Sequence, residues 1–290
     1  MRIFVAGATG VVGRPLVPLL MAAGHQVTGS SRTAEGAARL TALGATGVRA
    51  DALDPAGLRA VVAAAEPEVV VHQLTDLSGA DGAANGRLRR EGTRHLVDAA
   101  AAAGVRRIVA QSICWAYAPG DGPAGEEVPL DDTPDEARAR TVAAVRALER
   151  TAAELPDAVV LRYGLLYGPG TWYAPGGAVA AALAGERAVP FLGSTEADDA
   201  VSSFVHTADA ASAVLAALDW PGGPVNIVDD EPAAARDWLP VLAAALGVPA
   251  PVPAAAAGRP GWARGASNAL AARRGWRPGR PSWRSGFAAR

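Results

Sequence analysis

Three glycines close to the start of the chain, Gly7, Gly10 and Gly13, have the spacing of a loop that holds phosphate groups. The first glycine permits a tight turn, and the second lets a diphosphate approach the main chain. The third lets the following helix pack closely on the preceding strand. Free N–H groups and the positive dipole end at the start of that helix attract the anion. An apolar strand pattern precedes these glycines and a helical pattern follows them, which favours a dinucleotide site over a turn that binds nothing.

The residues that follow the second apolar run indicate which dinucleotide is bound. NAD sites usually place a carboxylate there for the ribose hydroxyls, whereas an arginine accommodates the additional phosphate of NADP. This chain has Ser31 and Arg32 at that point and no acidic residue before Glu35. A guanidinium can hold a phosphate through two hydrogen bonds. We therefore expect NADP rather than NAD, the alternative being that Arg32 is an ordinary solvated side chain.

These groups act together only if the chain places them at one edge of a sheet, and its hydrophobic pattern predicts such a sheet. Short runs rich in Val and Ile alternate with Ala-rich helical stretches. Buried strands joined by helices form a parallel sheet with helices on both faces, so we predict an α/β fold with a Rossmann-like doubly wound parallel sheet. Strands are expected at 3–6, 27–30, 48–50, 69–73, 108–112 and 159–163. Helices are expected at 11–23, 35–43, 56–65, 87–103 and 134–154.

The alternation loosens after about residue 165, which predicts a second, smaller lobe. We expect residues 1–165 to form the dinucleotide-binding Rossmann domain. Residues 166–290 are expected to form mostly a C-terminal substrate-binding lobe, with parts of 200–230 returning to the sheet.

Composition narrows the classes of function. The formal net charge of −2 gives no electrostatic reason to expect nucleic acid or a membrane surface as a partner. The longest apolar stretches are interrupted by Arg, Gly or Asp, so no membrane span is expected. No metal is expected either, because no His/Cys/Asp cluster has metal-ligand spacing, and the chain has no Gly-x-Ser-x-Gly segment of a serine hydrolase. With Cys114 as the single cysteine and no secretory signal pattern, we expect a cytoplasmic protein.

Several segments occur in an order that resembles a known family. They are GATGVVG, VVVHQL, IVAQSICWAY, LRYGLLYGPG and SSFVHTADAASAV. Together they resemble the extended short-chain dehydrogenases/reductases of the NAD(P)-dependent epimerase/dehydratase type. The resemblance implies that Asp51 and Ala52 border the adenine, and that residues 74–75 and 163–166 line the cofactor as far as the nicotinamide. The cofactor contacts expected in all are Gly7, Thr9, Gly10, Val11, Val12, Gly13, Ser31, Arg32, Asp51, Ala52, Leu74, Thr75, Tyr163, Leu165 and Leu166.

The usual proton relay of that family is missing from this chain. Family members carry a Tyr-x-x-x-Lys pair on one helical face, where the Tyr hydroxyl exchanges a proton with the substrate and the Lys lowers the Tyr pKa. Counting back from Glu149 puts Thr141 at the Tyr position and Val145 at the Lys position, and the chain contains no lysine at all. At two further family positions, an Asn and a Ser or Thr, this chain has Arg89 and Ile113.

The missing relay leaves three interpretations open, of which we favour the first. In this interpretation the chain is an NADP(H)-dependent oxidoreductase that acts on a hydroxyl or carbonyl of a small secondary-metabolite or sugar-like substrate. Its candidate catalytic residues are Ser112, Thr141 and Tyr163. A neutral threonine is a poor acid, so Tyr163, Tyr117 or a bound water would have to supply the proton.

The second interpretation is a cofactor-retaining epimerase or dehydratase, in which His72, Asp76 or His206 acts as a base. The third is an NADP(H)-binding module without catalytic activity. Aromatic side chains in the loops expected above the sheet speak against a pure binding module, because rings with few charges suit a small, partly apolar substrate. A homodimer is possible by analogy with the family. The substrate-binding residues expected are Trp115, Tyr117, Trp172 and Tyr173.

Overall fold

The chain forms two compact units, each built from several segments, in a computed structural model that describes residues 1–76, 82–186, 196–254 and 258–288. The first unit comprises Met1–Ser112, Pro134–Leu161 and Ala211–Pro224. The second unit comprises Ile113–Thr133, Arg162–Ala210 and Val225–Arg290. The sequence pattern predicts a single domain boundary at residue 165, whereas the two units alternate along the chain.

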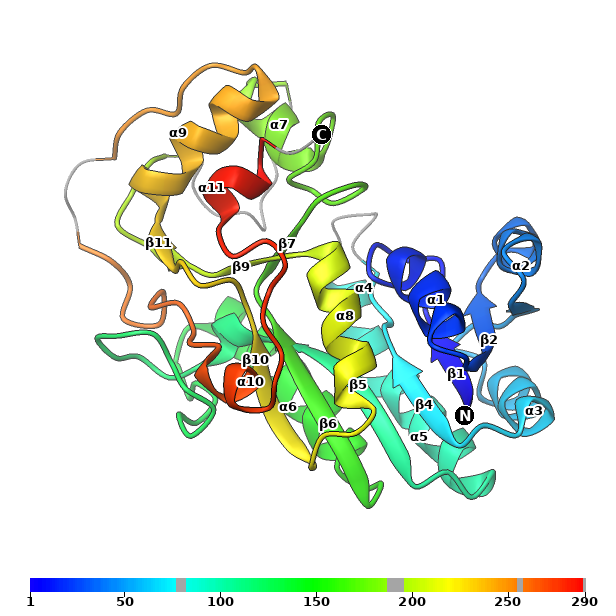
Figure 1. Ribbon diagram of the computed structural model, residues 1–290. Coiled ribbons are helices and arrows are strands. Elements are labelled where there is room, and N and C mark those ends of the chain that lie inside the picture. The colour runs from blue at the N-terminus through cyan, green and yellow to red at the C-terminus, as the bar shows by residue number, and fades with distance from the viewer. Residues whose placement is uncertain (77–81, 187–195, 255–257, 289–290) are drawn as a thin grey trace. The chain divides into compact units, whose positions relative to one another are not determined.

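A seven-stranded sheet runs in the order β10-β6-β5-β4-β1-β2-β3 (Figure 1). The pairs β1–β2, β1–β4, β2–β3 and β4–β5 are parallel. The Val and Ile content of β1, β4 and β5 suits strands that are buried on both faces. The predicted α/β fold with a Rossmann-like sheet is therefore confirmed. The strands are β1 Arg2–Ala6, β2 Gln26–Ser31, β3 Thr46–Arg49, β4 Val69–His72, β5 Arg107–Ile113, β6 Asp157–Tyr163 and β10 Gly223–Ile227.

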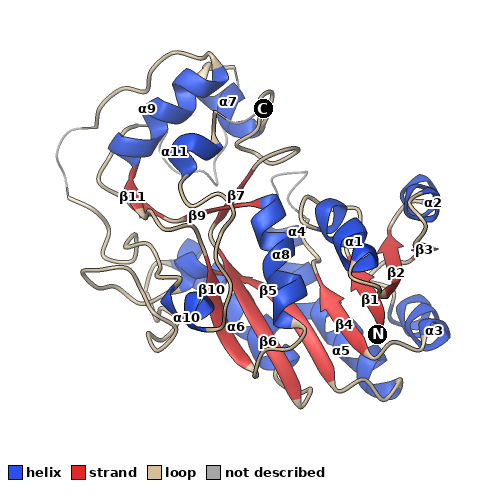
Figure 2. Ribbon diagram, in the orientation of Figure 1, coloured by secondary structure: helices blue, strands red, loops and turns tan. Residues whose placement is uncertain are grey.

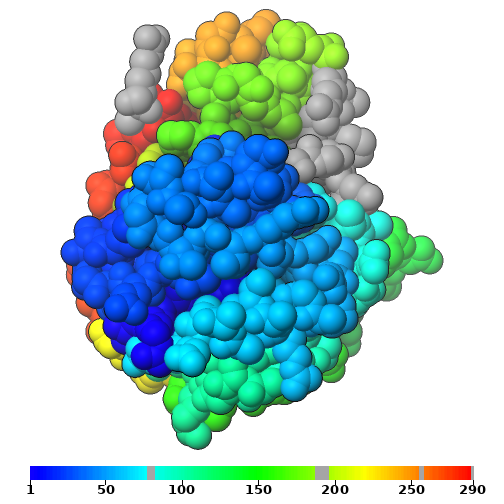
Figure 3. Space-filling view, turned by 90° about the vertical axis from the view of Figure 1, so that its right-hand side faces the viewer, coloured from blue at the N-terminus to red at the C-terminus, as the bar shows by residue number. Residues whose placement is uncertain are grey.

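Helices cover both faces of this sheet, with α1 on one face and α5 and α6 on the other (Figure 2). Their starts follow local capping rules: the side chains of Thr33 and Asp54 accept hydrogen bonds from main-chain N–H groups of α2 and α3, at 3.0 and 3.1 Å. In the space-filling view, α2 and α3 cover one side of the first unit (Figure 3). The helices are α1 Gly13–Ala22, α2 Ala34–Ala42, α3 Pro55–Ala65, α5 Thr93–Ala102, α6 Glu136–Ala152 and α8 Thr207–Ala217.

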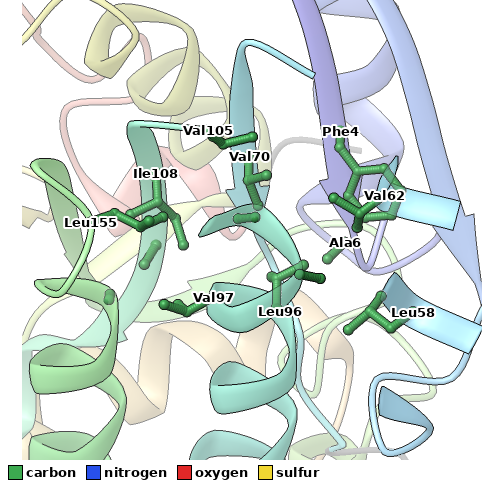
Figure 4. Packing of buried hydrophobic residues seen from close by; sticks show 14 of the residues in the cluster. Phe4, Ala6, Leu58, Val62, Val70, Leu96, Val97, Val105, Ile108 and Leu155 are labelled. Carbon is green, nitrogen blue, oxygen red and sulfur yellow. The ribbon is translucent and has the colours of Figure 1, made fainter. Parts of the chain in front are cut away.

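The core of the first unit lies where α3 and α5 pack on the sheet (Figure 4). Phe4, Val70 and Ile108 come from β1, β4 and β5, and Leu58 and Leu96 from the two helices. All five side chains are buried. Burial of such side chains stabilises the fold by roughly 1.5–3 kcal/mol each, which fixes the sheet edge that carries the polar residues described below.

The helical region after β4 differs from the single helix predicted at 87–103. It starts earlier, as α4 Gly82–Arg87, and it continues through a π-helical segment, η1 Leu88–Gly92, into α5. A π-helical turn places extra backbone in the helix; such turns are rare and frequently lie at functional sites. Helical periodicity in the sequence carries no signal for such a turn.

The second unit has its own small sheets and an aromatic core. Strands β7 Leu165–Tyr167 and β9 Phe204–His206 pair in parallel, and β8 Val201–Ser202 pairs antiparallel with β11 Ala233–Ala234. Around them lie η2 Cys114–Ala116, α7 Ala178–Leu183, α9 Ala235–Leu246, α10 Ala269–Arg273 and α11 Trp283–Gly286. We call the rings that pack together here, all edge to face except the tilted pair Trp283–Phe287, the aromatic cluster: Tyr167, Tyr173, Phe204, Trp238, Trp283 and Phe287.

Candidate active site

The turn between β1 and α1 has the shape that a dinucleotide diphosphate requires. Gly7 has a φ of +86°, and a Cβ there would lie 2.4 Å from the main-chain oxygen of Gln73, so only glycine fits. A Cβ on Gly13 would lie 2.5 Å from the carbonyl oxygen of Ala8. Gly10, in contrast, is exposed, and a Cβ there would meet nothing closer than a carbonyl oxygen at 3.3 Å. The first and third glycines therefore shape the turn, and the second leaves its outer side open to a ligand.

The start of α1 supplies hydrogen-bond donors to the same place. The residue before the helix is Val12, whose apolar side chain makes no capping hydrogen bond to the first turn. Uncapped N–H groups and the helix dipole together form an anion site. The residues present thus fit the diphosphate of a nicotinamide dinucleotide, with Thr9 and Val11 beside the glycines in the turn.

The polar residues after β2 are held together by hydrogen bonds. Ser31 is buried, and its Oγ accepts hydrogen bonds from the Thr9 hydroxyl at 3.5 Å and the Thr33 N–H at 3.3 Å. Arg32 is exposed and forms an ion pair with Asp76, with Nη1 at 3.1 Å from Oδ2. The Arg32 guanidinium is therefore accessible to a ligand phosphate, which has to compete with the Asp76 carboxylate.

The remaining residues expected near the cofactor in the first unit lie after β3 and β4. Asp51 is exposed, and Ala52 is buried with its carbonyl oxygen 2.8 Å from Nδ1 of His95. Leu74 is half-buried, and its carbonyl oxygen accepts a hydrogen bond of 2.7 Å from Gln111. Thr75 is exposed. Since Gln73 touches Gly7, the segment 73–75 borders the glycine turn.

Helix α6, where the family places its proton relay, is held to the sheet by a side-chain pair. The Ser112 hydroxyl at the end of β5 donates to Oε1 of Glu149 at 2.7 Å. One turn earlier lies Val145, which is 1% exposed, and two turns earlier lies Thr141, whose hydroxyl donates to the Ala137 carbonyl at 3.3 Å. Positions four and eight residues before Glu149 share its helical face. This face therefore carries an apolar isopropyl group and a hydroxyl in place of an amine and a phenol.

The nicotinamide-facing residues expected after β6 belong to the second unit. Tyr163 is 2% exposed at the end of β6. Leu165 and Leu166 are half-buried in β7, where they pair with Phe204 and Val205 of β9. Strand pairing fixes the main chain of this segment.

The four aromatic residues expected to bind substrate have different surroundings, all within the second unit. Tyr117 is 1% exposed, and its hydroxyl donates to Asn226 at 2.7 Å. Tyr173 belongs to the aromatic cluster, and burial raises its pKa. Trp115 and Trp172 are half-buried, and Trp172 packs against the aromatic cluster. Of the four residues, Trp115 and Trp172 have the larger accessible surface for a ligand.

The candidate bases are bound to structural partners. His72 is fully buried, its Nε2 lies 2.9 Å from the Thr93 hydroxyl, and burial lowers its pKa to about 4. His206 is buried, and its Nδ1 accepts a hydrogen bond from the Ala208 N–H at 3.1 Å. Both histidines thus brace the ends of their strands. Among the residues that the structure describes, no group of three or more His, Cys, Asp or Glu could hold a metal ion, and no helix there is long and apolar enough to cross a membrane.

The architecture and the glycine turn define an enzyme of the extended short-chain dehydrogenase/reductase class that binds a nicotinamide dinucleotide. Residues 3–227 match the NAD dependent epimerase/dehydratase family, and the chain belongs to this family. A 3-diazoavenalumate denitrifying reductase from a Streptomyces species is 48% identical, over 99% of this chain and 99% of that protein.

Solved structures show the same fold. A Thermus thermophilus UDP-glucose 4-epimerase in complex with NAD has a TM-score of 0.76 and 27% identity, over 99% of this chain and 97% of that one. The Bordetella bronchiseptica enzyme WbmG, in complex with NAD and UDP, has a TM-score of 0.74 and 20% identity, over 96% and 90% of the two chains. The likeness to WbmG shows the fold alone.

Proposed function

We propose that this enzyme is an NADPH-dependent reductase that replaces the diazo group of a small substrate with hydrogen and releases dinitrogen. Support comes first from the Streptomyces relative, whose name states a diazo substrate and a denitrifying reduction, and whose 48% identity extends over 99% of both chains. The ending of that substrate name denotes a carboxylate. The half-buried rings of Trp115 and Trp172 suit an aromatic ligand, so we propose an aryl diazonium compound that carries a carboxylate as the substrate class.

The observation that carries the proposal is the loss of the proton relay from α6. When bound, a reduced nicotinamide would supply a hydride for the new C–H bond, while the C–N bond would break and its electron pair would leave with dinitrogen. No proton enters this balance. Reduction of a carbonyl, in contrast, produces an alkoxide that must be protonated. A face with Val145 and Thr141 is therefore sufficient for the diazo reaction and poorly suited to carbonyl reduction.

The preference for NADPH rests on Arg32 and Ser31 at the end of β2. The Arg32 side chain is 61% exposed, so it can turn to a ligand without breaking the core. A planar guanidinium pairs with a phosphate through two hydrogen bonds, and this pairing is stronger than a single exposed ion pair. We infer that the 2′-phosphate of NADPH displaces Asp76 from Arg32.

A second candidate function is the reduction of a carbonyl or oxidation of a hydroxyl on a small metabolite. The Ser112–Glu149 pair favours it, because a hydroxyl bonded to a carboxyl group can pass on a proton. Ser112, Thr141 and Tyr163 are the residues that we propose for catalysis in this case. The proton would then be supplied by the pair or by the Tyr163 hydroxyl.

Isotope labelling separates these functions. The enzyme is incubated with a carboxylate-bearing aryl diazonium salt and NADPH deuterated at the transferred position, with heat-inactivated enzyme as the control for spontaneous reduction. We expect one dinitrogen per NADPH consumed and deuterium at the carbon that carried the diazo group, with none incorporated from heavy water. Label from the solvent at that carbon, or turnover of ketones but not of the diazonium salt, would contradict the proposal. Product formed without net NADPH consumption would indicate an epimerase or dehydratase.

A further inference from the structure

Arg89 is a half-buried cation in the π-helical segment η1, and burial lowers its pKa to about 10. Among residues 1–76, 82–186, 196–254 and 258–288, it has no hydrogen-bond or ion-pair partner. The acid of the same segment, Glu91, is paired with Arg87 at 2.8 Å. The next arginine along the helix, Arg94, is paired with Asp98 and with a second acid. Arg89 therefore differs from its neighbours in having a desolvated charge without a counter-ion.

The position of Arg89 is set by two fixed contacts, each about one helical turn away. On the N-terminal side, Asn85 accepts a hydrogen bond of 3.1 Å from the Asp76 N–H, just beyond β4. On the C-terminal side, the Thr93 hydroxyl lies 2.9 Å from His72, the last residue of β4. Residues one turn apart share a helical face, so Arg89 lies on the face that covers the end of β4. Its charge is close enough to His72 to help lower the pKa of that histidine.

This position places the cation beside segment 73–75, whose first residue touches Gly7 of the diphosphate turn. Burial of an unpaired charge is costly unless a partner of opposite charge compensates it. The π-helical turn that contains Arg89 is likewise a costly conformation that commonly marks a functional site. Two independent features, the unpaired guanidinium and the π-helical turn, thus coincide at the carboxyl end of β4.

We propose that Arg89 binds an oxyanion of a bound ligand at the carboxyl end of β4. Two ligands can supply this group: the diphosphate of the dinucleotide, or the carboxylate of the substrate. The second source rests on the proposed function, whereas the first does not. In either case Arg89 completes its pairing only when the ligand is bound.

The test compares Arg89→Gln with Arg90→Gln by calorimetric titration. Arg90 is exposed in the same segment, so its variant removes the same charge without removing the half-buried cation. If the diphosphate is the ligand, Arg89→Gln weakens NADP⁺ binding about 10- to 100-fold. If the substrate carboxylate is the ligand, NADP⁺ binding is unchanged, and binding of cinnamate to the NADP⁺ complex is weakened by that factor while binding of cinnamamide is not. Arg90→Gln changes each constant less than about 2-fold.

Thermal melting without ligand distinguishes a binding role from a structural one. Because the charge is unpaired in the free enzyme, Arg89→Gln is expected to melt at the same temperature as the wild type or higher, and Arg89→Lys to recover part of the lost affinity. The proposal is wrong if Arg89→Gln binds NADP⁺ and cinnamate as the wild type does. It is equally wrong if NADP⁺ binding is unchanged and the wild type does not prefer cinnamate to cinnamamide. None of these measurements depends on turnover of a diazonium salt, so a failure of the proposed reaction would be seen separately.

Discussion

The turn between β1 and α1 and the inward face of α6 lie in the same unit, but only the turn keeps the residue pattern of the family. The turn retains every feature that a diphosphate needs, down to the main-chain contact at Gly7. The face of α6 retains its attachment through Glu149 and Ser112 but has Val145 and Thr141 where the family has its relay. Holding a dinucleotide and supplying a proton are therefore separable tasks, and this chain keeps the first.

The largest effect is expected from adding a side chain to the glycine turn between β1 and α1. Gly7→Ala combines a positive φ with a Cβ 2.4 Å from a carbonyl oxygen, so we expect a loss of at least about 3 kcal/mol in the free energy of unfolding and no measurable NADPH binding. Gly24→Ala is the matched control, because Gly24 has a φ of +84° but no atom within 4 Å of a Cβ. It should cost about 1 kcal/mol and leave NADPH affinity intact. Calorimetry and denaturant unfolding measure both; equal behaviour of the two variants would contradict our account of the turn.

Low pH should lower the free energy of unfolding of the protein through His72, which lies next to the cofactor turn at the end of β4. The pKa of His72 is about 4 in the folded protein against 6.5 for the ordinary side chain. The unfolded chain therefore takes up a proton first as the pH falls. The stability due to the neutral histidine is present above pH 6.5 and is lost between pH 6.5 and about 4, by up to about 3 kcal/mol. Unfolding titrations of His72→Gln should lack this loss, whereas His25→Gln should retain it. A parallel pH dependence in wild type and His72→Gln would refute the assignment.

The proposed preference of the cofactor site for NADPH over NADH can be tested at Arg32. Arg32→Gln should weaken NADPH binding about 10- to 100-fold, because it removes a charge-assisted pair with the 2′-phosphate, and it should leave NADH binding within about 2-fold. Asp76→Asn should strengthen NADPH binding about 2- to 3-fold, since it releases the guanidinium from its ion pair. Arg39→Gln, an exposed change in α2, is the control. An Arg32→Gln enzyme that still prefers NADPH would show that the phosphate is bound elsewhere.

The smallest effect is expected on the α6 side. Glu149→Gln weakens a hydrogen bond to Ser112 and should lower the free energy of unfolding by about 1 kcal/mol. Turnover of the diazonium salt should stay within about 2-fold of wild type, because that reaction takes up no proton. Glu136→Gln, at an exposed site on the same helix, should change neither quantity. A large loss of turnover in a stable Glu149→Gln protein would favour the carbonyl-reducing candidate and a relay through this pair.

The sheet and the glycine turn could be predicted from the sequence because their signals are local. Runs of Val and Ile bounded by turns located β1, β2, β4, β5 and β6 to within two residues, and the glycines act through their own backbone. The count back from Glu149 was also local, since it stays within one helix.

Contacts between distant segments carried no such signal. The pairing of Arg32 with Asp76 joins residues 44 apart, and no periodicity relates them. The π-helical turn at 88–92 packs against α6, a segment distant from it in the sequence. Tyr173 was expected at a pocket wall, and the structure places it in the aromatic cluster, because an apolar ring in a loop has the same sequence pattern in either place.

The interleaved make-up of the two units has a consequence for how the protein can be made. The first unit needs Ala211–Pro224, so a nascent chain cannot complete it before residue 224 has been made. Trp283, which has no exposed surface, belongs to the second unit and is made later still. Because each unit consists of three segments, a single cut in the chain cannot separate them. Expression of the chain as two fragments would therefore leave at least one of the units incomplete.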